Sequence, residues 1–151
     1  MKLRTRILCG LLFVCVLGMG AALGAKKKGC TEEQGQQAEK ETDNLKNWES
    51  VYVFFRKYAR CDSGGVAEGV SDGVAKLFAD RWGTVADFVV MSEQNKNFEK
   101  FVLRHVDSNI NSAGDTQKIR ENAKLHCPAN LARLCKELIV KTAPPRDMGP
   151  H

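Results

Sequence analysis

The sequence predicts an all-α domain held together by disulfides, and three observations lead to this prediction. Beyond residue 42, apolar residues recur at three- and four-residue steps, which is the period of a helix that buries one face. No segment reads as a convincing strand. Four cysteines follow an N-terminal stretch of the export type. We therefore expect an irregular antiparallel bundle of five or six helices over residues 43–141, stapled by one or two disulfides.

The size and charge of the chain narrow its function. A length of 151 residues suits a single domain. The formal net charge of +5 is concentrated at the start, because six Lys and Arg residues and no acid precede Gly29, so the remainder carries a formal charge of −1. A nearly neutral domain lacks the basic surface of a nucleic-acid-binding protein. We therefore expect no nucleic-acid partner.

Residues 1–25 are typical of a signal peptide. MKLRTR is a positive start, an apolar run covers Ile7 to Leu17, and small residues follow. We expect cleavage after Ala25, or after Ala22 or Gly24. The same stretch is just long enough to remain as an anchor across ~30 Å of hydrocarbon, but its small-residue end favours cleavage. The protein is then periplasmic or secreted, with no membrane attachment after cleavage.

The remaining cysteines are Cys30, Cys61, Cys127 and Cys135. An even number in an exported chain favours disulfides over a zinc site, and no C-x-x-C pair is present. If Cys127 caps the helix that contains Cys135, the two lie about 12 Å apart at 1.5 Å per residue, beyond the ~7 Å limit. We therefore expect Cys61 to pair with one of them and Cys30 with the other, the bridge from Cys61 being the tighter.

The two ends of the mature chain are polar. Residues 26–42 contain little to bury, so we expect a flexible segment, and residues 142–151, with two consecutive prolines, should form a disordered tail. Asp43 is the predicted N-cap of the first helix. The apolar stripe of that helix is rich in aromatic residues, and we interpret it as core: Leu45, Trp48, Val51, Tyr52, Phe54, Phe55, Tyr58 and Ala59.

A turn and a second long helix follow Cys61. The sequence CDSGG is close to the GDSGG around the nucleophile of trypsin-like proteases, but Ser63 lies in a helical context, so we interpret it as a turn residue. Gly69 and Gly73 lie one helical turn apart and would let a neighbouring helix approach closely. We predict that they form a helix-packing face.

Three titratable residues are candidates for binding or catalysis. Glu68 and Asp72 are one helical turn apart and could act as a carboxylate pair, although Lys76 makes a solvated ladder the simpler interpretation. His105 beside Asp107 could be a general base, but a histidine on an apolar face is more often a hydrogen-bonded core residue. No ligand spacing joins the histidines. We expect no metal and no cofactor.

The later helices are shorter. Thr84 with Asp87 resembles a capping box, and Asn97 and Asp115 are predicted to cap the next two helices. Pro128 suits the first turn of the last helix, on which Cys135 faces inward.

The motifs also carry a family resemblance. The chain is similar to small exported helical bacterial proteins of no assigned function, which implies a bacterial origin and a helical fold but no activity. The matching residues form the pattern C-D-x-G-x-x-A-E-x-x-S (Cys61, Asp62, Gly64, Ala67, Glu68, Ser71), F-V-L-R-H (Phe101 to His105) and C-P-x-x-L-x-x-L-C (Cys127 to Cys135).

Three functions fit these observations. The first is an exported non-enzymatic interaction protein with a protein partner in the cell envelope, such as a periplasmic immunity or inhibitor protein. The second is a small-molecule or metal-binding protein with a cavity between the helices that begin near residues 45, 66 and 97. The third is a small hydrolase in which Glu68, Asp72 and His105 converge. An exposed acidic or apolar patch favours the first, and a solid core opposes the second.

Overall fold

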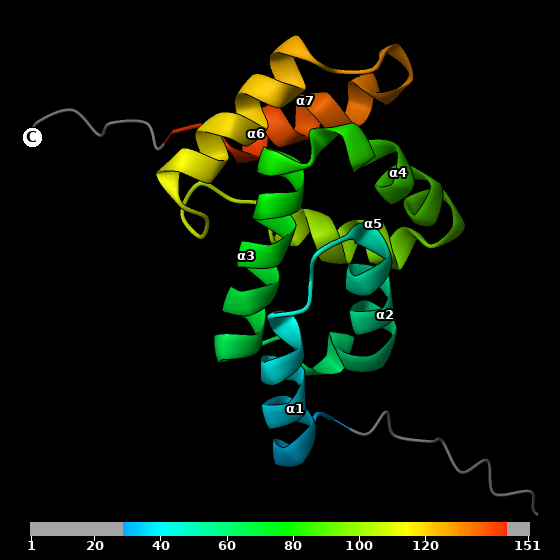
Figure 1. Cartoon of the computed structure of the whole chain (residues 1–151), viewed down its shortest axis with the longest axis vertical. Helices are drawn as coiled ribbons and strands as arrows, with labels where there is room; N and C mark the ends of the chain where they lie inside the picture. Colours follow the sequence, from blue (N-terminus) through cyan, green and yellow to red (C-terminus); the bar gives the residue numbers. More distant parts are fainter. Residues whose placement is uncertain (1–28, 145–151) are drawn as a thin grey trace, which may run out of the picture.

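The computed structural model describes residues 29–144, and within that range the chain is all-α (Figure 1). The all-α, disulfide-stapled fold is confirmed, with more helices than expected. Residues 1–28 and 145–151 lie outside the described range, and with them the predicted signal peptide, the start of the predicted flexible segment and most of the predicted tail. The described helices are α1 (Glu32–Thr42), α2 (Trp48–Tyr58), α3 (Gly64–Asp80), α4 (Val85–Gln94), α5 (Lys96–Arg104), α6 (Ala113–Leu125) and α7 (Ala132–Lys141), with short 3₁₀ turns η1 (Ala59–Cys61), η2 (Trp82–Thr84) and η3 (Ala129–Leu131).

The longest helix, α3, runs through the middle of the molecule. It packs against α1 at one end and against α6 at the other, and α7 lies beside α6 (Figure 1). The α4 and α5 helices form a second pair, and both contact α2. The α3 helix therefore contacts α1, α2 and α6, which come from both halves of the described chain.

The prediction of a flexible segment over residues 26–42 is wrong for most of its length, because α1 occupies residues 32–42. The hydroxyl of Thr31 accepts a hydrogen bond from the Gln34 backbone N–H, and the Gln34 side chain accepts one from the Thr31 backbone N–H. This capping box satisfies free donors at the helix start. The tether of α1 is the Cys30–Cys61 disulfide, and Ala38 is fully buried against the core. A polar helix thus forms because tertiary contacts hold it.

The two glycines of α3 lie where α1 ends. A Cβ added at Gly69 would lie 2.6 Å from Cβ of Thr42, and one at Gly73 would lie 2.9 Å from Cβ of Leu45. Real Cβ atoms do not approach other atoms so closely, so the side chains of Thr42 and Leu45 occupy the space that a side chain at these positions would fill. The close approach is between α3 and the α1–α2 connection.

The first helix boundary differs from the prediction. Asp43 is the C-cap of α1, and α2 begins at Trp48 with Asn47 as its N-cap. The Asn47 side chain accepts a hydrogen bond from the Ser50 N–H, and the Ser50 hydroxyl accepts one from the Asn47 N–H. The prediction of Asp43 as cap was wrong because that residue still belongs to the preceding helix.

Other predicted caps were also wrong. The side chain of Asn95, not Asn97, caps α5, and that of Ser112, not Asp115, caps α6. Thr84 precedes α4, but its hydroxyl donates to the Arg81 carbonyl instead of forming a capping box. At α5 and α6 a polar side chain two or three positions earlier in the chain reaches the free N–H groups, whereas α4 has no side-chain cap.

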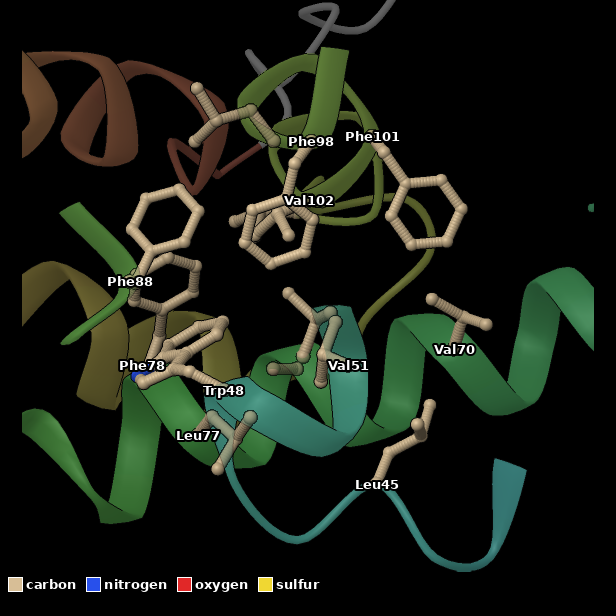
Figure 2. Close-up of a cluster of buried hydrophobic side chains, with 14 of the residues drawn as sticks. Leu45, Trp48, Val51, Val70, Leu77, Phe78, Phe88, Phe98, Phe101 and Val102 are labelled. Carbon is tan, nitrogen blue, oxygen red and sulfur yellow. The ribbon is translucent and has the colours of Figure 1, made fainter. Parts of the chain in front are cut away.

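Aromatic side chains fill the interior (Figure 2). Trp48 of α2 lies with its ring centroid 4.7 Å from Phe78 and 4.9 Å from Phe88, and Phe98 of α5 closes the cluster 5.9 Å from Phe88. All of these rings are almost completely buried. The space between α2, α3 and α5, where a ligand cavity was an alternative, is occupied by this core.

The disulfide connectivity differs from the prediction. All four predicted cysteines are bonded, but Cys30 pairs with Cys61 and Cys127 pairs with Cys135, with Cα atoms 4.9 Å and 6.1 Å apart. The prediction assumed that Cys127 begins a continuous helix. Instead Pro128 is extended and precedes η3, and α7 starts only at Ala132, so the chain folds back and brings the two cysteines together. The Cys61 disulfide therefore ties the turn between α2 and α3 to the start of α1, not to the last helix.

Candidate functional site

His105, the C-cap of α5, lies at the centre of a polar cluster that joins α3, α5 and the turn after η1. It follows the last residue of α5, only 4% of its surface is exposed, and its ring lies edge-on to Phe101 with centroids 4.9 Å apart. It is therefore a buried histidine at a helix C-terminus.

Two side chains bind the ring of His105 from different elements. Nδ1 lies 2.8 Å from Oγ of Ser71 in the middle of α3, and Nε2 lies 3.2 Å from Oδ2 of Asp62 in the turn after η1. The guanidinium of Arg104 donates to the same carboxylate oxygen. The cluster connects the turn beside the Cys30–Cys61 disulfide to α3 and α5. Neither Asp62 nor Ser71 was predicted as a partner of His105.

The hydroxyl of Ser71 limits where the protons lie. Its Oγ is also 2.8 Å from the backbone carbonyl of Ala67, and a hydroxyl has one hydrogen to donate. If that hydrogen goes to Ala67, Nδ1 of His105 must donate to Ser71, while Nε2 donates to the carboxylate of Asp62. All of these contacts are hydrogen bonds together only when both ring nitrogens carry hydrogen.

The carboxyl of Asp62 is buried and ionised in this cluster. Burial by itself would raise its pKa, but the hydrogen bond to His105 and the charges of His105 and Arg104 outweigh burial, so the pKa of Asp62 lies below its ordinary value of 3.8. Oδ1 of the same carboxylate is buried and has no partner among the described residues. The ion pairs on Oδ2 therefore carry the stabilisation of this charge.

The Asp62–His105–Ser71 order resembles that of a hydrolytic triad, but the geometry favours a structural link. Ser71 is only 3% exposed and lies inside α3, where backbone N–H groups are used by the helix. A nucleophile needs access to substrate and nearby N–H donors for the oxyanion. Ser71 borders the pocket described below, but its side chain is almost fully buried and the N–H groups around it are used within α3.

Glu68 and Asp72 lie on the outer side of Ser71. They line a pocket of about 550 Å³ between α3 and the start of α6, together with Asp115 and the exposed Ile110. Asp72 forms an ion pair of 2.6 Å with Lys76, as the ladder interpretation supposed.

The structure therefore separates the three predicted candidates. It brings Glu68 and Asp72 together at the pocket, while His105 lies beneath Ser71, with both ring nitrogens engaged. In residues 29–144 no hydrogen bond joins His105 to either acid, and no group of three or more His, Cys, Asp or Glu side chains is placed to hold a metal ion. Ser71, which bonds His105 and also lines the pocket, is the last residue of the C-D-x-G-x-x-A-E-x-x-S pattern in the sequence.

Comparison with known proteins adds no function. The chain matches no protein-family model, and neither the curated proteins nor the solved structures give a significant match. In the described part of the chain, no helix combines the length and apolar character that a membrane span requires. The function is therefore argued from the geometry alone.

Proposed function

We propose that this chain is an exported, non-enzymatic binding protein that takes up a basic segment of a protein partner in the cell envelope, as a periplasmic immunity or inhibitor protein would. The observation that carries the proposal is the pocket between α3 and α6. Glu68, Asp72 and Asp115 place three carboxylates around it, and Ile110, 56% exposed, borders it.

Charge and shape decide the class of partner. Lys76 neutralises one of the three carboxylates through its pair with Asp72, so the pocket keeps an excess of negative charge. A lysine or arginine side chain complements it, and an apolar neighbour on the partner covers Ile110. Because such charges are exposed, they act mainly on the rate and specificity of association and weaken in salt.

Two features support an exported scaffold. Both disulfides suit an oxidising compartment, and residues 1–25 have the composition of a signal peptide. The bridges and the filled aromatic core make the framework around the pocket rigid, which lowers the entropy lost on binding.

The two alternatives receive less support. A hydrolase needs His105 in one cleft with Glu68 and Asp72, and both ring nitrogens of His105 are already bonded to other residues. A ligand site in the centre of the bundle needs a cavity where Trp48 and Phe98 now pack.

The test begins with the oxidised mature chain, which is used to capture partners from a cell-envelope extract, and each purified partner is then titrated. We expect binding that weakens with salt and drops about tenfold or more in Glu68→Lys. Glu121→Lys is the matched control, because Glu121 is exposed on α6 and bonds Gln117 outside the pocket. Equal loss in both variants, or full binding by Glu68→Lys, would overturn the proposal.

A further inference from the structure

The helix α1 is fastened to the rest of the molecule at both ends. At its start, Cys30 is bonded to Cys61 in η1. At its end, the connection to α2 is held by Leu45, which is 5% exposed and packs against Gly73 of α3. Between these two points α1 lies at the edge of the bundle, beside the first turns of α3 (Figure 1). The helix is therefore arranged as a strap across α3.

Few contacts hold α1 between its two fastenings. Of its eleven residues, Ala38 alone is buried. Glu41 accepts hydrogen bonds of 2.9 Å from Lys57 and Tyr58 of α2, but the Lys57 side chain is 55% exposed, so this ion pair contributes little. A helix this short is marginal by itself, and ordering eleven residues costs more free energy than these contacts supply. The docking of α1 therefore depends on the Cys30–Cys61 bridge.

The other helices do not depend on α1 in this way. The aromatic rings of the core come from α2, α3, α4 and α5: Trp48, Phe78, Phe88 and Phe98. The α3 helix also packs on α6, α6 packs on α7, and the Cys127–Cys135 bridge fixes the connection between these last two helices. We therefore expect residues 48–141 to keep their fold when α1 is released.

We propose that the Cys30–Cys61 disulfide is a redox latch for α1, which lies on α3 while the bridge is formed and swings away about residues 43–47 when a dithiol reduces it. In that step the S–S bond takes up two electrons and two protons, both cysteines become thiols, and the dithiol is oxidised to a disulfide. Opening uncovers Tyr58, which is 4% exposed in the closed form, and the face of α3 that carries Gly65 and Gly69. A chain that has not met an oxidising compartment carries the open latch, and oxidation closes it.

This latch is separate from the acidic pocket. The residues that line that pocket belong to α3, to the connection that precedes α6 and to the first turn of α6. They lie in the part of the chain that keeps its fold, so the latch can fail without affecting the proposed binding, and the reverse also holds.

The experiment measures backbone order parameters by NMR on the oxidised, ¹⁵N-labelled mature chain and on two double variants. In Cys30→Ser/Cys61→Ser, the order parameters of residues 36–40 should fall from about 0.85 to below about 0.6, while those of α3 and α5 stay near about 0.85. In the matched control, Cys127→Ser/Cys135→Ser, α1 should stay rigid, because the bridge that fastens it is intact.

Reduction of the folded protein guards against a variant that fails to fold. Dithiothreitol, a dithiol, should loosen α1 in Cys127→Ser/Cys135→Ser, which retains the Cys30–Cys61 bridge, and oxidised glutathione should restore its order parameters. The proposal is overturned if α1 stays rigid once mass spectrometry shows both thiols free, if dithiothreitol leaves the bridge intact, or if both double variants loosen α1. It is also overturned if α2–α7 lose their native resonances together with α1, because the bridge would then staple the whole bundle.

Discussion

Removing the carboxylate of Asp62 tests whether the cluster around His105 holds the fold together. Asp62 receives the buried ring of His105 and the guanidinium of Arg104, whose side chain is 54% exposed. A hydrogen bond to a charged group contributes about 1.5–3 kcal/mol, whereas an exposed ion pair contributes about 0.2–1 kcal/mol. Asp62→Ala should therefore lower the free energy of unfolding by roughly 2–4 kcal/mol.

The matched variant is Arg104→Ala, which leaves the buried contact between His105 and Asp62 in place. Arg104→Ala should lower the free energy of unfolding by less than about 1 kcal/mol. Urea denaturation followed by circular dichroism at pH 7, with both disulfides intact, measures each difference. The reasoning is refuted if Arg104→Ala costs as much as Asp62→Ala, because the exposed pair would then carry the stabilisation.

Comparison of the wild-type protein with Asp62→Ala at different pH values gives a stability difference whose pH dependence has a definite sign. The pKa of Asp62 in the folded protein lies below its ordinary 3.8, so ionised Asp62 stabilises the fold fully above that value. The contribution is lost as the pH falls through the lower folded pKa. The stability difference between wild type and Asp62→Ala should therefore shrink when the pH drops below about 4. A difference that grows in acid would contradict the assignment.

Three further predictions follow from packing and cross-links. Gly69→Ala should destabilise by about 1–3 kcal/mol through overlap with Thr42, while Gly83→Ala, with nothing within 4 Å, should not. Removing the Cys30–Cys61 bridge by paired serine substitutions should cost about 1 kcal/mol more than removing Cys127–Cys135, since it closes the longer loop; non-reducing peptide mapping checks the pairing. Glu99→Gln should lower the free energy of unfolding by about 1–3 kcal/mol at pH 7. Burial raises the pKa of Glu99, but its bonds to Arg133 and Lys96 outweigh burial and hold the folded pKa below 4.5. The difference from wild type should therefore fade as the pH falls below 4.5.

The predictable part of the fold followed from local physics. The three- and four-residue spacing of apolar side chains predicted α2, α3 and the core face of α5, because burial of one helix face requires that spacing. The helix α1 was missed because its surface is almost entirely polar. Its capping box, Thr31 with Gln34, was nevertheless readable as T-E-E-Q.

The site was predictable only in part. The sequence singled out three candidate residues, Glu68, Asp72 and His105, but their spacing does not show which of them lie together in the fold. Asp62 reaches His105 across 43 positions in the sequence, and Ser71 reaches it across 34.

By itself, the sequence determined the helical class, the cysteines that would be oxidised and the aromatic residues of the core, because periodicity, composition and export pattern are local properties. Tertiary structure decided the pairing of the cysteines, since one extended proline turns the chain back before α7. It also decided that His105 is sealed beneath Ser71 while Glu68 and Asp72 face a pocket. Which side of a helix meets which neighbour depends on how all the helices pack, and no single segment contains that information.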